Sequence, residues 1–116
     1  MLVDMHTQIE AARLLLRKAA AVNSKSSGNG FPDMLEAAQA KIFASEMAIK
    51  VTNDALQIFG SSGYSRNFPL ERMARDARMF TIGGGTAQIL RTVVASALLE
   101  RKLPQTRDGY SKQGKH

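Results

Sequence analysis

The sequence contains no cysteine and only two histidines among its 116 residues. Without cysteine the chain can form neither a disulfide nor a thiol site, which fits a reducing compartment such as the bacterial cytoplasm or the mitochondrial matrix. His6 stands near Asp4 and Glu10, whereas His116 is the last residue. One histidine beside scattered carboxylates lacks the ligand set of a metal centre. We therefore expect no bound metal.

Long apolar runs and aromatic side chains are also scarce. No apolar stretch approaches the length needed to cross a bilayer, and the first residues lack a secretory pattern, so we expect no membrane insertion. The net charge of +6 favours anionic partners. Aromatic residues make up only 6% of the chain and no nucleic-acid reader motif is present, which argues against nucleic acid as that partner. Part of the charge falls in residues 104–116, which we expect to form a disordered polar tail.

Apolar residues recur at three- and four-residue steps, which predicts helices and no strand. The first helix is expected over residues 2–23, and the second runs from a capping box at Asp33 and Glu36 to a glycine cap at Gly60. The third begins near Pro69, and the fourth follows the N-cap Thr86 to about residue 102. The second helix is apolar over so wide an arc that it should be central. These features predict an all-α, antiparallel four-helix-bundle-like domain over residues 1–103.

A loop of three glycines, Gly83 to Gly85, enters the fourth helix. Its open backbone N–H groups and the helix dipole could bind an anion. The alternative is a tight turn between helices that needs positive φ angles, which glycine adopts cheaply. Because no strand precedes the loop and no phosphate-loop lysine follows it, the residues alone favour the turn.

Several charged side chains are candidates for functional groups. Glu46 and Asp54 lie more than two helical turns apart, so salt bridges or solvation suit them better than a joint acid–base role. A set of arginines could hold a cofactor or a neighbouring chain, but pairing with nearby carboxylates is the favoured interpretation. The set consists of Arg66, Arg72, Arg75, Arg78 and Arg91, with Glu71, Asp76 and Glu100 as the expected partners.

Read together, these segments resemble the C-terminal helical domain of flavin-dependent acyl-CoA dehydrogenases. The resemblance covers residues 2–99 and is most distinctive over residues 54–63 and 69–77. It implies α,β-dehydrogenation of an acyl-CoA thioester: a carboxylate takes the α-proton, hydride passes to the flavin, and electrons usually continue to electron-transfer flavoprotein. It also implies a homo-oligomer, typically a tetramer, in which this domain touches FAD held largely by a neighbouring subunit. The FAD positions that carry over are Gln57, Ile58, Phe59, Gly60 and Ser61, then Gly85, Thr86, Ala87 and Gln88.

The chain departs from the family pattern at Gly84, where most members carry the catalytic glutamate. Glycine cannot abstract a proton, so no catalytic residue is assigned here. The isovaleryl-CoA and long-chain branches also lack this glutamate and place their base on an earlier helix, which this sequence does not contain. The family's other two domains are missing too, so we expect no activity from this chain alone. Two alternatives stay open: a stand-alone helical interaction module derived from the family, and part of an enoyl-CoA-reducing relative.

Overall fold

The computed structural model describes residues 1–26 and 33–103, and every regular element within these ranges is a helix. The helices are α1 (Leu2–Ser26), α2 (Met34–Phe59), α3 (Ser61–Tyr64), α4 (Leu70–Met79) and α5 (Ala87–Leu98). The all-α prediction is confirmed for these residues. The predicted tail over 104–116 lies outside the described residues.

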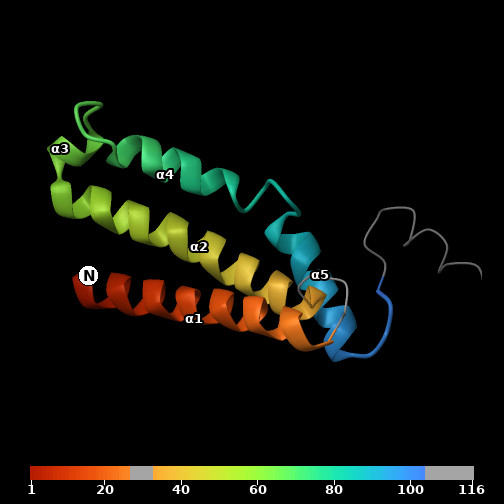
Figure 1. Ribbon diagram of the computed structural model, residues 1–116. Helices are drawn as coiled ribbons and strands as arrows, with labels where there is room; N and C mark the ends of the chain where they lie inside the picture. The colour runs from red at the N-terminus through yellow and green to blue at the C-terminus, as the bar shows by residue number, and fades with distance from the viewer. Residues whose placement is uncertain (27–32, 104–116) are drawn as a thin grey trace, which may run out of the picture.

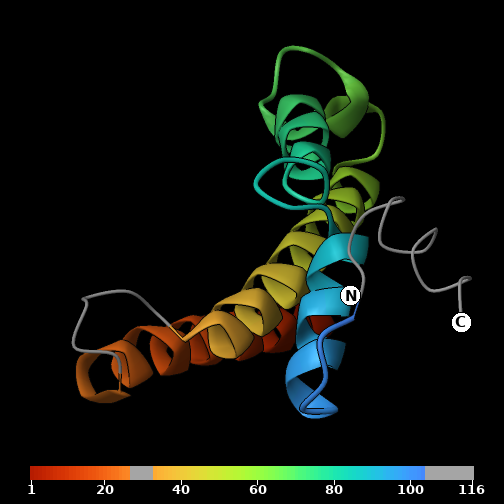
Figure 2. The same cartoon turned by 90° about the vertical axis from the view of Figure 1, so that its right-hand side faces the viewer.

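Helix α2 is the central helix of the domain (Figure 1). It contacts α1, α3, α4 and α5, whereas α1 reaches neither α4 nor α5 within the described part of the chain. Figures 1 and 2 show α1 running antiparallel beside α2, α4 along another side of α2, and α5 near the end where α2 begins. The wide apolar arc of α2 therefore packs against α1, α4 and α5, as its central position in the prediction requires.

The helix ends follow local capping chemistry with three differences from the prediction, the first being that α1 continues to Ser26, beyond the predicted end at residue 23. Asp33 caps α2, but its carboxylate accepts a hydrogen bond from the Leu35 N–H at 2.9 Å. The Glu36 carboxylate instead pairs with Lys18 of α1 at 3.1 Å, so this acid links two helices and does not complete a capping box. The predicted N-cap Thr86 is confirmed, because its hydroxyl accepts from the Ile89 N–H at 3.1 Å.

Helix α5 ends at Leu98, earlier than residue 102. The Arg101 N–H donates to the Ser96 carbonyl at 3.1 Å and the Glu100 N–H to the Ala97 carbonyl at 3.3 Å. This pair of bonds is a Schellman motif, and it requires the residue after the cap to adopt a left-handed conformation. Glu100 does so with φ of 49°. A glutamate is an unusual residue at this position, which is why the sequence did not signal the stop.

The buried core consists of small side chains. In the part of the chain that the structure describes, six apolar residues are buried, all of them alanines: Ala12, Ala19, Ala38, Ala40, Ala77 and Ala87. No large side chain among the described residues is fully buried, and many large apolar ones are exposed, including Leu2 (70%), Leu98 (67%) and Phe80 (51%). Alanine contacts let the helices approach closely but bury little apolar area. The domain therefore leaves much of its apolar surface uncovered.

No helix in the described ranges combines the length and the apolar character needed to cross a membrane.

Candidate functional site

The two sets of predicted flavin-contacting residues lie at opposite ends of α4 (Figure 1). The first set closes α2 and opens α3, and the second precedes and begins α5. Lys41 of α2 contacts the loop of the second set, and at about 1.5 Å per residue the stretch of α2 from Lys41 to Gln57 is about 24 Å long. The fold therefore does not bring the two sets together within one chain.

Three residues of the first set line an open hollow of about 570 Å³ where α2 meets α3. Gln57, Gly60 and Ser61 line it together with Asn53, Leu56 and Tyr64. Gln57 is exposed, as its place on the polar strip of α2 predicted, and Ile58 and Phe59 are 46% and 50% exposed. The hollow thus combines two amides, two hydroxyls and apolar surface.

Two glycines shape this corner. Gly60 ends α2 with φ of 58° and ψ of −136°. Its φ is positive, as expected of a capping glycine, but its ψ lies outside the left-handed helical well, in a region that essentially only glycine adopts. The chain then makes the single turn of α3, which the sequence did not predict because one turn carries no helical periodicity. Gly63 packs this turn against α2 and is buried.

The second set belongs to a compact turn between α4 and α5. The N–H groups of Ile82 and Gly83 both donate to the Met79 carbonyl, at 2.9 and 2.8 Å, and the Ala87 N–H donates to the Thr81 carbonyl at 3.0 Å. Thr81 is buried, accepts a hydrogen bond from the Arg78 guanidinium and donates to the Arg78 carbonyl. The start of α5 is thereby tied directly to the end of α4.

Lys41 holds this turn from α2. Its Nζ atom donates to the Gly83 carbonyl at 2.7 Å and to the Gly85 carbonyl at 2.5 Å. These partners are 42 and 44 residues away in the sequence. The sequence did not identify this contact, because no local pattern marks a lysine that reaches so distant a loop.

The glycines of the turn adopt positive φ angles, 68° at Gly84 and 93° at Gly85. This agrees with the turn interpretation favoured from the sequence. A Cβ added at Gly84 would meet nothing within 4 Å, whereas one at Gly85 would lie 3.3 Å from Leu90 Cδ2. Gly84 therefore faces open space, and its backbone conformation, not crowding, is what favours glycine there.

The arginine set is partly paired internally. Arg75 binds the Glu71 carboxylate through Nε at 2.9 Å, and this hydrogen bond lowers the pKa of Glu71 below its ordinary value. The same contact raises the pKa of Arg75. Arg91 pairs with Glu46 of α2 at 2.7 Å, and this contact between α2 and α5 differs from the carboxylate partners expected from the sequence. Glu100 makes no ion pair within the described residues.

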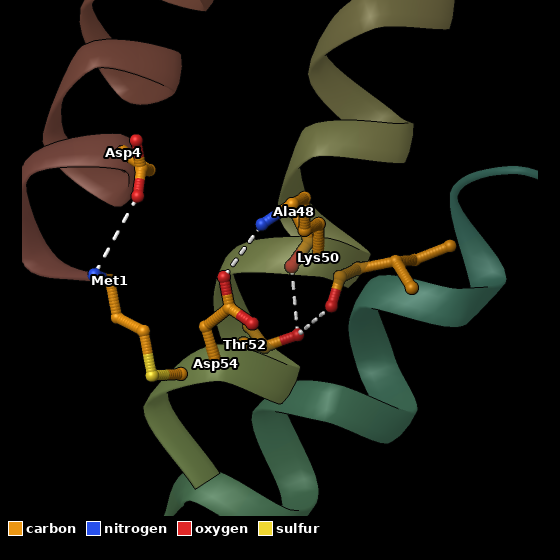
Figure 3. Close-up of polar contacts among 7 residues, drawn as sticks. Met1, Asp4, Ala48, Lys50, Thr52 and Asp54 are labelled. Carbon is orange, nitrogen blue, oxygen red and sulfur yellow. Dashed lines mark hydrogen bonds and ion pairs between the residues drawn. The ribbon is translucent and has the colours of Figure 1, made fainter. Parts of the chain in front are cut away.

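The proposal of a joint acid–base role for Glu46 and Asp54 finds no support in their contacts. Asp54 accepts a hydrogen bond from Lys50 at 2.8 Å, which raises the pKa of the lysine (Figure 3). In the same view the Thr52 hydroxyl donates to the Ala48 carbonyl at 2.7 Å. Both acids are engaged in ion pairs, as the sequence favoured. Within the described ranges no group of histidines and acids could hold a metal ion.

Comparison with known proteins defines the class. The family model described as acyl-CoA dehydrogenase, C-terminal domain, matches residues 1–99. In solved structures, butyryl-CoA dehydrogenase from Megasphaera elsdenii superposes with a TM-score of 0.77 at 45% identity, covering 84% of this chain and 24% of that one. The chain therefore belongs to the acyl-CoA dehydrogenase family as its C-terminal helical domain. FAD as the expected cofactor is confirmed at the level of this family.

Curated relatives with higher identity carry a different name. The 3-sulfinopropanoyl-CoA desulfinase of Advenella mimigardefordensis is 69% identical over 97% of this chain, and that of Variovorax paradoxus is also 69% identical over 97%. The chain spans about a quarter of the length of these relatives, 27% in both cases.

Proposed function

We propose that this chain is the C-terminal, flavin-contacting and oligomerising domain of an enzyme that removes the sulfinate group from 3-sulfinopropanoyl-CoA. The main support for this substrate is the identity of 69% to the two desulfinases over nearly the whole chain. Identity to butyryl-CoA dehydrogenase is 45%. The organisms of these relatives favour the bacterial cytoplasm as the compartment.

Gly84 fits a desulfinase, whose reaction needs no loop carboxylate, and it equally fits the dehydrogenase branches whose base lies on an earlier helix. Removal of an α-proton needs a base, and the loop offers a position without a side chain. Desulfination breaks the bond between C3 and sulfur instead: water supplies a hydrogen to C3 and a hydroxyl to sulfur, giving propanoyl-CoA and hydrogen sulfite. The acyl chain is not oxidised to an enoyl product and no electrons leave the enzyme. Electron-transfer flavoprotein is then not a required partner.

The proposed flavin contacts follow the two sets of residues, of which Ala87 is buried and Thr86 is half-buried. In this proposal Gln57 to Ser61 contact FAD through the hollow at the α2–α3 junction, and Gly85 to Gln88 contact it through the start of α5. Because about 24 Å of α2 separates Gln57 from Lys41, whose ammonium contacts the loop of the second set, the two sets reach separate parts of one cofactor or the cofactors of two subunits. The thin alanine core supports a homo-oligomer, with a tetramer as the family expectation.

The substrate is tested by assaying the intact protein with 3-sulfinopropanoyl-CoA and, in parallel, with butanoyl-CoA. We expect release of sulfite and propanoyl-CoA from the first substrate and no butanoyl-CoA-dependent dye reduction. Dye reduction without sulfite release would instead favour a dehydrogenase with its base on an upstream helix. Reduction of an enoyl-CoA would favour the reductase alternative. A protein without flavin or either activity would favour the interaction module.

The flavin contacts are tested separately by FAD titration of intact Gln57→Ala and Thr86→Ala. We expect each variant to bind FAD about tenfold more weakly, which corresponds to about 1.4 kcal/mol for one lost hydrogen bond. Thr86→Ala also removes the cap of α5, so Thr86→Ser, which keeps the hydroxyl, is the matched control and should bind FAD normally. Wild-type affinity in both alanine variants would reject the assigned contacts.

A further inference from the structure

We propose that Lys41 is a positioning residue that holds the loop over residues 83–86 in the conformation needed to contact the flavin; this rests on the proposed function. Lys41 belongs to α2, and no role follows for it from the flavin positions assigned above. Its two hydrogen bonds, to the carbonyls of Gly83 and Gly85, are the observation that carries the inference.

The two carbonyls belong to the peptide planes that contain the N–H groups of Gly84 and Thr86. In a trans peptide the carbonyl and the N–H point in opposite directions. Fixing both oxygens against the Lys41 ammonium therefore aims the N–H groups of Gly84 and Thr86 away from Lys41. Neither N–H has a hydrogen-bond partner in the described part of the chain. They are donors that remain free for an acceptor outside this domain.

Among the described residues the Lys41 ammonium has polar contacts only with the loop carbonyls. Lys18 and Lys50 each pair with a carboxylate, at 3.1 and 2.8 Å, whereas Lys41 has no acid within ion-pair distance among the described residues. An ammonium bound to a carbonyl polarises the peptide and strengthens its N–H as a donor, because linked hydrogen bonds reinforce one another. The lysine thus both orients and strengthens the donors of Gly84 and Thr86.

The side chain is itself held in place. Lys41 is half-buried and lines an apolar groove with Ala37, Ala40, Ala44 and Phe80. Packing of its aliphatic stem in this groove restricts the side chain, so that little further entropy is lost when the ammonium binds the two carbonyls. A methionine would keep the stem in the groove and remove only the charge and the donors.

The test uses the intact protein with Lys41→Met, Lys41→Arg as the conservative rescue, and Lys50→Met as the matched control on the exposed face of the same helix. Two quantities are measured: hydrogen exchange in residues 80–91 of the flavin-free protein, and the Kd for FAD. We expect Lys41→Met to accelerate exchange at the turn amides of Gly83 and Ala87 and to raise the Kd about tenfold. Lys41→Arg should restore most of both, and Lys50→Met should change neither.

The outcomes separate this inference from the proposed function. Wild-type exchange of the turn in Lys41→Met, in a variant whose melting temperature shows that it is folded, would overturn the positioning role. Faster hydrogen exchange of the turn with an unchanged Kd for FAD would show that Lys41 orders the loop, and it would reject the loop as a flavin contact. Equal weakening of FAD binding by Lys41→Met and Lys41→Arg would also overturn the inference, because an arginine can still donate to both carbonyls.

Discussion

At the scale of single residues, Gly63 shows how a missing side chain positions the candidate hollow. A Cβ at this position would lie 2.8 Å from the Leu56 carbonyl oxygen and 2.9 Å from Phe59 Cβ. Both neighbours belong to the last turns of α2, whose backbone cannot move without displacing the hollow-lining residues. The close approach of α3 to α2 therefore depends on glycine.

We expect Gly63→Ala to destabilise the protein by about 2 kcal/mol, because the added methyl group overpacks a contact with backbone atoms. The neighbouring Ser62→Ala is the control; Ser62 is exposed, so its substitution should cost less than about 0.5 kcal/mol. Urea denaturation of the two variants measures the difference. Equal stability of both would mean that α3 moves aside without cost.

The sequence could predict some residues of the candidate site better than others. Thr86 was predictable as an N-cap because capping involves neighbours within one turn. Lys41 was not, because its role depends on two carbonyls more than forty residues further along the chain. The ion pairs Arg91–Glu46 and Lys18–Glu36 were not predicted for the same reason, because each joins two different helices.

At the scale of elements, α4 carries an ion pair along one face. Glu71 and Arg75 stand one turn apart in the favourable order, as the sequence predicted. The hydrogen bond from Arg75 keeps the pKa of Glu71 lower in the folded protein than in the unfolded chain. A group with a depressed folded pKa stabilises the protein above its unfolded pKa, and this contribution is lost as the pH falls through the folded value.

Glu71→Gln should therefore lower the melting temperature slightly at pH 7. The difference from wild type should shrink as the pH falls below about 4.3, the ordinary pKa of glutamate. Added salt should also reduce it, since Arg75 is exposed and Glu71 is only half-buried. Glu100→Gln, which removes an acid without an ion pair in the described residues, should show no such pH dependence. A constant offset of Glu71→Gln at every pH would contradict the pairing.

The bounds of the elements were predictable where a cap stands in the sequence. Asp33 and Gly60 enclose α2 as expected, while α5 ended early because Glu100 takes the left-handed position usually held by glycine. The single turn of α3 had no periodic signal and depends on the packing of Gly63.

At the scale of the whole molecule, the domain exposes more apolar surface than a stable monomer usually does. Among the described residues every buried apolar side chain is an alanine, while Leu2, Leu14 and Leu98 are 70%, 62% and 67% exposed. We expect the isolated 116-residue chain to self-associate, because other domains or other copies would cover these residues in an intact enzyme. Light scattering at increasing concentration measures this; a monodisperse monomer at high concentration would refute it.

The helical class, the central position of α2, the family and the lack of a side chain at Gly84 could all be predicted from the sequence. These follow from periodicity, caps and motifs, all of which act over a few neighbouring residues. Only the tertiary structure decided that the two candidate flavin sets lie at opposite ends of α4, that Lys41 holds the glycine loop, and that Arg91 joins α5 to α2. Such contacts join residues far apart along the chain, and they exist only once α2 has packed against its neighbours.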